Sequence, residues 1–427
     1  MNKLIYVILF VSVIMVSVWA MARDDSQQDV RENPQMQMGD TTSLRDNTYP
    51  KFINKKANHI DLNGDDWSDL AIKFTYCDSL PVNILHIGDS HLQCDVATDI
   101  VRQELVALYG RSHGRGLVVP FKLAGTNQPY DYSITSRSTF AKATLLKTPW
   151  PITMGFTGVA LRPSISLFDF SIQSPEVFNY ITVFFTGRAP VVNAVMTEKG
   201  PAAYMVSNST DTSITIEVVE LVKSVDLTLG LTDSNTSIHG FNLVRGNSGI
   251  SYHVIGNNGA TYTHYNMIKD FCACTSQLSP DLIIISLGTN EAFGRVVTSE
   301  ITSQIDALVK NLRHHNPEAK FLLVTPAECQ RRQRSRRRRR RSSSYVVNEK
   351  VAQVRKIIAD YARAHNIALY DWYAVAGGAG ASTQWLNNKY LNTDRIHLTM
   401  AGYKLQGNIF ADALINTLIL SESTTEE

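Results

Sequence analysis

Four short apolar runs, separated by helical patterns, constrain the fold more than any other feature of this sequence. They are near-continuous and occupy residues 82–87, 282–287, 321–324 and 367–370, with a weaker fifth run at 252–255. A strand that is apolar on both faces belongs inside a parallel sheet covered by helices on both sides. The sequence therefore predicts an α/β domain with three layers, in which a flavodoxin-like parallel sheet lies between helices.

The intervening segments support this prediction. Apolar residues recur at helical spacing over residues 301–312 and 347–361, and a last helix is expected from about Met400 to Leu418. The stretch from 121 to 248 differs, because it has many short segments rich in Val, Ile, Thr, Phe and Tyr, punctuated by Asn, Ser, Gly and Pro. That pattern is typical of an antiparallel β-sandwich, here inserted into the α/β domain.

These patterns divide the chain into six parts, one of which contains a distinct loop. In order, they are a signal peptide or membrane anchor (1–22), a linker (23–65), the first part of the α/β domain (66–120), the β-sandwich insert (121–248), the second part of the α/β domain (249–420), an arginine-rich loop within that part (331–344), and a tail (421–427).

The N-terminus resembles an export signal. Lys3 precedes an apolar run over residues 4–20, and Ala20-Met21-Ala22 then leads into charged residues. The run is nearly long enough to span a bilayer, so an uncleaved anchor stays open as an alternative to cleavage. We expect an exported protein of the periplasm or cell envelope.

Charge and cysteine content exclude several classes of protein. Nine of the 41 basic residues lie between Arg331 and Arg341, and the other 32 are outnumbered by the 39 acidic residues. Basic character is therefore local, and general nucleic-acid binding is not supported. The five cysteines are scattered and fit neither a zinc site nor a dense disulfide framework. They are Cys77, Cys94, Cys272, Cys274 and Cys329.

Polar, chemically capable residues follow the predicted strands. Gly88-Asp89-Ser90 follows the first run, and Gly288-Thr289-Asn290 follows the run at 282–287. Because the carboxyl ends of parallel strands share one edge of the sheet, we expect these segments to lie close together. Ser90 stands where a strand ends and a helix starts, which suits a nucleophile but also an ordinary helix cap.

A second segment supplies the partners that a nucleophilic serine needs. Asp394 and His397 lie three residues apart, just before the last predicted helix. A histidine can accept the proton of a serine when a carboxylate fixes its tautomer and orientation. The Asn290 amide and the backbone N–H groups of Ser90 and Gly259 are candidate donors to an oxyanion.

Together, the blocks Gly88-Asp89-Ser90, Gly259, Gly288-Thr289-Asn290 and Asp394-x-x-His397 resemble, in order, the four signature blocks of SGNH/GDSL hydrolases. The resemblance covers the α/β part of the chain, roughly half of its length. It implies Ser90, His397 and Asp394 as catalytic residues and Ser90, Gly259 and Asn290 as the oxyanion hole, with no metal or organic cofactor. Glu291 departs from the family, which more often has Asp at this position.

A narrower resemblance comes from Gly88-Asp89-Ser90-His91 together with the β insert. This arrangement is similar to peptidoglycan O-acetylesterases, whose insert resembles a carbohydrate-binding module. It implies removal of O-acetyl groups from an acetylated cell-envelope polysaccharide. Deacetylation of another polymer and acyl transfer to a sugar stay open as alternatives, because the same serine, histidine and aspartate would serve these reactions. A non-catalytic glycan-binding protein is a third alternative.

Substrate contacts are expected at the same edge of the sheet, where the carboxyl ends of the parallel strands meet. The candidates are His91, Trp372, Arg331, Arg332 and Arg334. His91 and Trp372 could line a sugar site or pack in the core. The arginine-rich segment leaves the end of a strand, so it could draw an anionic polymer to the site or simply be a solvated loop.

Overall fold

The computed structural model describes residues 44–334 and 343–423. The predicted signal or anchor, the first half of the predicted linker, residues 335–342 of the arginine-rich loop and the last four residues lie outside the described residues. Within the described ranges, no helix is long and apolar enough to cross a membrane.

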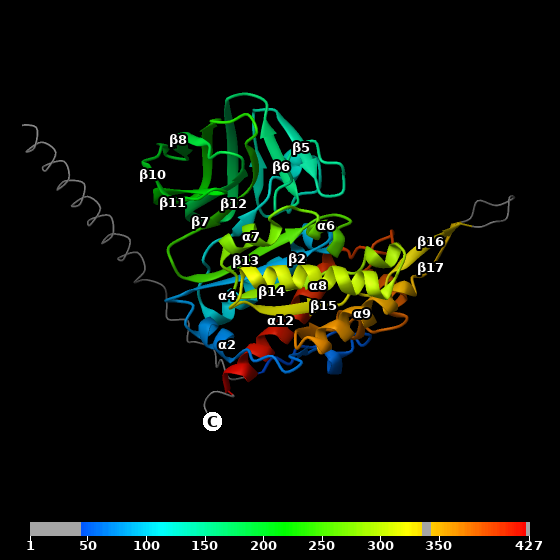
Figure 1. Ribbon diagram of the computed structural model, residues 1–427. Coiled ribbons are helices and arrows are strands. Elements are labelled where there is room, and N and C mark those ends of the chain that lie inside the picture. The colour runs from blue at the N-terminus through cyan, green and yellow to red at the C-terminus, as the bar shows by residue number, and fades with distance from the viewer. Residues whose placement is uncertain (1–43, 335–342, 424–427) are drawn as a thin grey trace, which may run out of the picture. The chain divides into compact units, whose positions relative to one another are not determined.

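A six-stranded sheet forms the centre of the α/β domain (Figure 1). Its order is β1 (Ile60–Asp61), β18 (Ala368–Tyr370), β15 (Lys320–Val324), β14 (Leu282–Ser286), β2 (Pro81–Gly88) and β13 (Gly249–Gly256). All neighbours are parallel except β1, which pairs antiparallel with β18. The five parallel strands have the flavodoxin-like order, with the first strand placed between the second and third. The predicted fold class is confirmed.

Alternating side chains of the central strands pack into two separate cores. Leu85 and Ile87 join the core with α8 (Thr298–His315) and α9 (Lys350–Ala364). Val82 and Ile84 point to the other face. They join α2 (Ser68–Thr75), α4 (Val96–Tyr109) and α12 (Met400–Ser423). Both faces are therefore buried, which explains why these strands are apolar throughout.

The remaining α-helices are short. They are α3 (Ser90–Gln93), α5 (Phe121–Ala124), α6 (Tyr262–Asn266), α7 (Phe271–Thr275), α10 (Trp372–Val375) and α11 (Ala381–Asn387). Single turns of 3₁₀-helix occur at Lys55–Ala57, Ser276–Leu278 and Glu291–Phe293. All five cysteines are free thiols.

The insert forms a ten-stranded antiparallel sheet (Figure 1). Its strands are β3 (Gly116–Val118), β4 (Ser133–Thr135), β5 (Phe140–Thr144), β6 (Val159–Pro163), β7 (Leu167–Thr186), β8 (Val191–Thr197), β9 (Gly200–Pro201), β10 (Tyr204–Ser209), β11 (Ser213–Gly230) and β12 (Ser237–Val244). The predicted antiparallel character is confirmed, but all ten strands share one hydrogen-bonded network. Register shifts between Glu217 and Ser224 interrupt the long pairing of β7 with β11.

Two predicted boundaries need correction. Strand β3 pairs with β12, so the insert's sheet begins before residue 121. Residues 44–65, predicted as linker, pack on the α/β domain instead. Their polar groups bond to α12: the backbone N–H and carbonyl of Arg45 exchange hydrogen bonds with the Asn416 side chain, and the Tyr49 hydroxyl donates to Asp412. A polar segment looks like a solvated linker in sequence when its partners lie more than 350 residues away.

Candidate active site

The end of β2 places Ser90 at the first position of α3. Asp89 caps this helix, because its carboxylate accepts a hydrogen bond from the His91 N–H at 2.9 Å. A Cβ on Gly88 would lie only 2.8 Å from the Ser286 carbonyl oxygen. A larger residue at 88 would therefore push β2 away from β14, and with it the turn that carries Ser90.

The structure brings Ser90, His397 and Asp394 together in series. Ser90 Oγ lies 2.8 Å from His397 Nε2, and His397 Nδ1 lies 2.7 Å from Asp394 Oδ2. The other carboxylate oxygen of Asp394 accepts from the N–H groups of Ile396 and His397 at 2.9 and 3.0 Å. A carboxylate at Nδ1 favours the tautomer whose Nε2 can accept the serine proton.

Hydrogen bonds keep Asp394 ionised. Partial burial alone would raise the pKa of Asp394, but the hydrogen bond from His397 and the two backbone N–H groups hold it below its ordinary value. The side chains of His397 and Asp394 are 37% and 46% exposed, so the pair is open to solvent on one side.

His91 lies behind this pair. Its ring centroid is 5.3 Å from that of His397, and its Nδ1 is 3.2 Å from the Tyr403 hydroxyl. Burial lowers the pKa of His91, and this effect together with the neighbouring His397 outweighs the charges of Asp89 and Asp394, which raise it. His91 packs beside the imidazole of His397, and its role in substrate binding stays a prediction.

The three candidate oxyanion donors belong to neighbouring loops. Within the described residues, neither the Ser90 N–H nor the Gly259 N–H donates to a protein acceptor, so both can serve a ligand. Asn290 Nδ2 donates to the Ala260 carbonyl at 3.0 Å and to Asp89 Oδ2 at 3.3 Å. These bonds place its amide between the two loops, but a bound oxyanion would have to replace one of them.

The loop that carries Gly259 depends on contacts that the sequence did not reveal. Gly259 has a positive φ of 74°, and the Leu146 side chain of the insert fills the space where a Cβ would lie. Gln93 of α3 is buried, and its Oε1 accepts from the Asn258 N–H at 2.6 Å. The same side chain donates to the Asn127 carbonyl of the insert at 2.7 Å. Gln93 therefore joins the serine turn, the Gly259 loop and the insert.

Glu291 follows Asn290 and points into the interior. Its Oε1 accepts from the Tyr262 N–H at 2.9 Å, close to the Gly259 loop. Although the residue as a whole is partly exposed, its Oε2 is buried and has no partner in the described part of the chain. Burial, with a smaller contribution from the charge of Asp89, raises the pKa of Glu291 to about 7, against backbone N–H groups that lower it. The sequence marked this residue only as a departure from the family.

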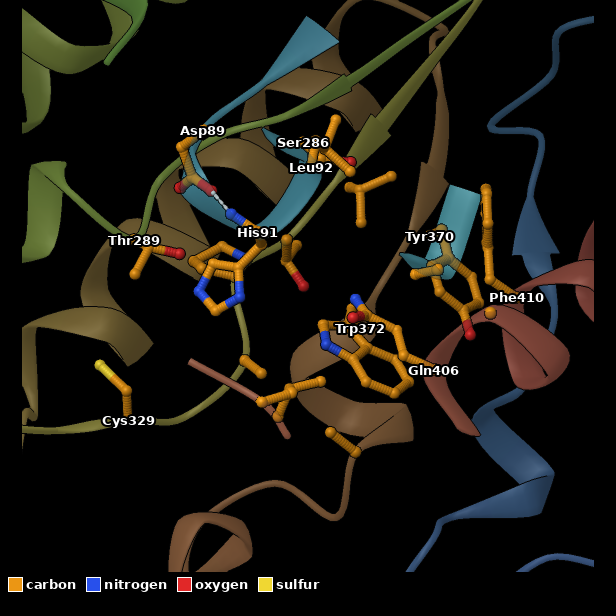
Figure 2. Close-up of a pocket in the computed structure, with 18 of the residues that line it drawn as sticks. Asp89, His91, Leu92, Ser286, Thr289, Cys329, Tyr370, Trp372, Gln406 and Phe410 are labelled. Atoms are coloured by element: carbon orange, nitrogen blue, oxygen red, sulfur yellow. Dashed lines mark hydrogen bonds between the residues drawn. The ribbon is translucent and has the colours of Figure 1, made fainter. Parts of the chain in front are cut away.

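A mainly apolar cavity lies beside the candidate triad (Figure 2). Asp89 and His91, which flank Ser90, line it, as do Ile396 and Leu398, which flank His397. Trp372 lies in its wall, as Figure 2 shows, and is only 4% exposed. Trp372 therefore has no exposed face on which a sugar could stack, and it packs against Tyr370 and Trp385 instead.

The arginine-rich segment forms a two-stranded antiparallel ribbon of β16 (Gln330–Arg334) and β17 (Ser343–Val347). Arg331 and Arg332 are exposed on it. The side chain of Arg334 and residues 335–342 lie outside the description. In the sequence this segment looked like a loop, because arginine-rich runs carry no strand pattern. We call this pair of strands the ribbon.

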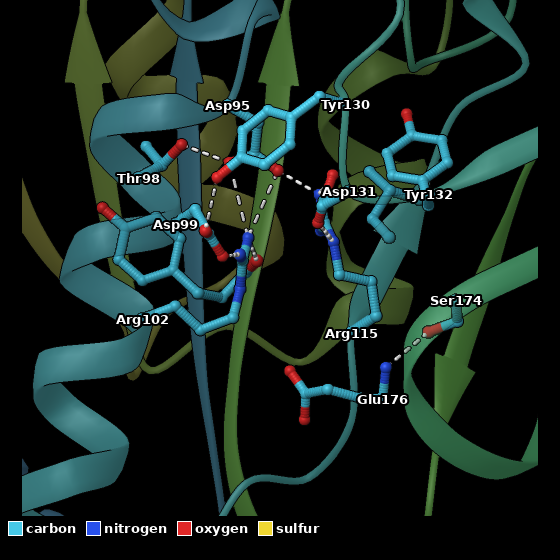
Figure 3. Close-up of polar contacts among 12 residues, drawn as sticks. Asp95, Thr98, Asp99, Arg102, Arg115, Tyr130, Asp131, Tyr132, Ser174 and Glu176 are labelled. Carbon is cyan, nitrogen blue, oxygen red and sulfur yellow. Dashed lines mark hydrogen bonds and ion pairs between the residues drawn. The ribbon is translucent and has the colours of Figure 1, made fainter. Parts of the chain in front are cut away.

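A buried ionic cluster supports the first turn of α4, directly after the serine helix (Figure 3). Asp95 is buried between Arg102 and Arg115, and Arg115 also pairs with Asp131 of the insert. Burial alone would lower the pKa of Arg115, but the two carboxylates raise it well above its ordinary value. The cluster fixes the insert to the domain that carries Ser90.

These observations define a hydrolase-type α/β domain with a serine, histidine and aspartate in hydrogen-bonding order. Among the described residues, no group of histidine, cysteine, aspartate and glutamate could hold a metal ion.

Comparison with known proteins supports the predicted family over the second part of the α/β domain. Residues 227–405, less than half of the chain, match the family model of the GDSL-like lipase/acylhydrolase family. This part of the chain is therefore similar to GDSL-like hydrolases, in agreement with the resemblance that the sequence predicts. No curated protein matches the sequence.

Solved structures match this chain to different extents. A structure described as a peptidoglycan O-acetylesterase in action has a TM-score of 0.67 and 18% sequence identity, and the match covers 84% of this chain and 97% of that one. A GDSL-like lipase from Bacteroides thetaiotaomicron has a TM-score of 0.29 and 21% identity, covering 38% of this chain and 75% of that one. A family two carbohydrate esterase from Clostridium thermocellum has a TM-score of 0.30 and 10% identity, covering 66% and 99%. Of these three matches, the first extends over most of both chains at a TM-score that supports a common fold.

Proposed function

We propose that this protein removes O-acetyl groups from a cell-envelope polysaccharide, with Ser90 as nucleophile. The observation that carries the proposal is the hydrogen-bonded series from Ser90 Oγ through His397 to Asp394, with distances of 2.8 and 2.7 Å. A serine hydroxyl is a weak nucleophile on its own, and this arrangement is one that activates it.

The proposed reaction has two halves. Ser90 Oγ attacks the ester carbonyl carbon while its proton moves to His397 Nε2, and negative charge develops on the carbonyl oxygen. The N–H groups of Ser90 and Gly259, with the Asn290 amide, stabilise that charge. Collapse of the intermediate breaks the bond to the sugar oxygen, which takes the proton from His397 and leaves Ser90 acetylated.

Water completes the cycle. His397 takes a proton from a water molecule, the resulting nucleophile attacks the acetyl carbonyl, and Ser90 leaves with the proton as acetate is released. Asp394 keeps the imidazole oriented and stabilises its protonated form in both halves. These steps require no cofactor.

The proposed substrate is O-acetylated peptidoglycan. Two observations support it: the Gly88-Asp89-Ser90-His91 block with a β insert, and the likeness in fold, insert included, to a structure described as a peptidoglycan O-acetylesterase. The apolar N-terminal run supports export to the periplasm or cell envelope, with cleavage or retention as a membrane anchor.

We also propose that the arginine-rich ribbon draws anionic polymer to the site. Arg331 and Arg332 are exposed, and in the described part of the chain neither forms an ion pair. Activity on a charged acetylated polymer should therefore fall as salt rises, whereas activity on a neutral acetyl ester should not. Equal salt sensitivity for both substrates would contradict this role.

The experiment that tests the function measures acetate release by the full-length protein. O-acetylated peptidoglycan is compared with acetylated xylan, and Ser90→Ala serves as the control for each. We expect release from peptidoglycan that the substitution abolishes. Preference for xylan would reassign the substrate, and a wild type as inert as Ser90→Ala on every ester would favour a glycan-binding protein.

A further inference from the structure

Arg395 adopts a strained backbone conformation at the centre of the Asp394–His397 loop. Its φ is +66°, in the left-handed region that residues other than glycine rarely occupy. The loop lies at the surface, since the side chains of Asp394 and His397 are 46% and 37% exposed. A strained residue in an exposed loop persists only when surrounding contacts hold it.

Contacts within the loop account for part of this restraint. The Arg395 N–H donates to the Asn392 carbonyl at 3.0 Å, and the Asn392 N–H donates to the His397 carbonyl at 2.8 Å. Neither bond fixes the Arg395 carbonyl or its side chain. Those two groups extend toward a different part of the chain.

The partners of both groups belong to the ribbon. The Gln330 N–H of β16 donates to the Arg395 carbonyl at 3.0 Å. The Arg395 guanidinium lies over the Tyr345 ring of β17, 5.2 Å from its centroid, which is the geometry of a cation–π contact. Each strand of the ribbon therefore holds one side of Arg395.

The base of the ribbon is itself fixed in the domain. Gln330 is buried, and its Nε2 donates to Ser382 Oγ at 3.3 Å. Just after β17, the Asn348 N–H donates to the Cys329 carbonyl at 2.9 Å. Asn348 Nδ2 donates to the Ala292 carbonyl, in the turn that also carries Asn290, at 3.0 Å. The ribbon base therefore contacts two of the segments that form the site.

We propose that Tyr345 and Gln330 are positioning residues for the reaction, an inference that rests on the proposed function of Ser90. Through Arg395 they hold the Asp394–His397 loop in the conformation that keeps His397 Nε2 at Ser90 Oγ. This role belongs to the base of the ribbon and does not depend on the arginines of residues 335–342. The ribbon thus serves the reaction even when the substrate carries no charge.

Tyr345→Ala tests the inference on p-nitrophenyl acetate, a small neutral ester that needs no anion-binding site. We expect kcat to fall about fivefold with KM unchanged, the effect of losing one partly exposed cation–π contact. Tyr345→Phe keeps the ring and should restore kcat. Gln333→Ala, an exposed change on the same ribbon, is the matched control and should leave kcat at the wild-type value.

A double-mutant cycle isolates the path through Arg395. Arg395→Gly removes the guanidinium while tolerating a positive φ, so Tyr345→Ala should have no further effect in that background. A wild-type kcat in Tyr345→Ala, or the same loss with and without Arg395, would overturn the inference. Ser90→Ala separates the two proposals: if Ser90→Ala stays active, the proposed function fails, whereas loss of activity in Ser90→Ala with a fully active Tyr345→Ala removes only the positioning role.

Discussion

Glu291→Gln should make the protein's stability less sensitive to alkaline pH. The Glu291 carboxyl has a pKa of about 7 in the folded protein, against 4.5 as its ordinary value, because burial and the charge of Asp89 outweigh the backbone N–H groups that favour its charged form. The folded state therefore favours the protonated form. Stability from this group is fully present below pH 4.5 and is lost as the pH rises through 7.

The size of the effect follows from the two pKa values. The complete loss is about 3 kcal/mol, and about 2.5 kcal/mol of it falls between pH 5 and pH 8.5. The glutamine side chain of Glu291→Gln would keep the acceptor for the Tyr262 N–H but would bury an amide group without a partner. The variant can therefore be less stable than wild type at pH 5, and only the change with pH reports the carboxyl.

The assay is urea unfolding of wild type and variant at several pH values from 5 to 8.5, followed by tryptophan fluorescence. The free energy of unfolding of Glu291→Gln should rise relative to wild type by about 2.5 kcal/mol across that range. Glu318→Gln, at an exposed position before β15, is the control and should show no such trend. A difference between Glu291→Gln and wild type that stays constant with pH would refute the argument.

Three further predictions concern the triad, the ionic cluster and the buried His239 of β12. Asp394→Asn should lower kcat by about 10³-fold or more with little change in KM, because an amide donor opposes the required tautomer of His397; a kcat within tenfold of wild type would contradict this. Arg115→Met should lower the free energy of unfolding by about 3–5 kcal/mol, since it leaves Asp131 without its arginine and leaves Arg102 as the one remaining arginine at buried Asp95; Arg137→Met, whose side chain is 88% exposed, should have little effect. Burial lowers the pKa of His239 to about 3, so its contribution to stability is present above pH 6.5 and lost as the pH falls. The free energy of unfolding of His239→Gln, measured relative to wild type, should therefore be about 2 kcal/mol higher at pH 5 than at pH 7. A difference between variant and wild type that does not change with pH would argue against this.

The central strands could be predicted from sequence because both of their faces are buried. Every residue of β14 except Ser286 is apolar, and this pattern needs no knowledge of the neighbours. The ribbon could not be predicted, since its strands lie beside an arginine run and carry no alternation. The helical prediction for Val347 is also wrong. Val347 fits the helical spacing of the residues after it, but in the structure it is the last residue of β17.

The candidate site divides in the same way. Residue type and spacing predict the chemistry of the local motifs that contain Ser90, Asp394 and His397. The structure places these three residues in contact. Gln93 and Glu291 stand in no such motif. Their importance comes from partners that only the folded chain brings near, such as the Asn258 N–H for Gln93, 165 residues away.

Covalent labelling of Ser90 tests the central claim most directly. The full-length protein is treated with a fluorophosphonate, which forms a stable adduct with an activated serine, and the modified peptide is identified by mass spectrometry. We predict a single adduct on Ser90, formed in parallel with loss of esterase activity and strongly slowed by His397→Ala. Full inactivation with the adduct on another residue, or esterase activity that survives complete modification of Ser90, would contradict the account.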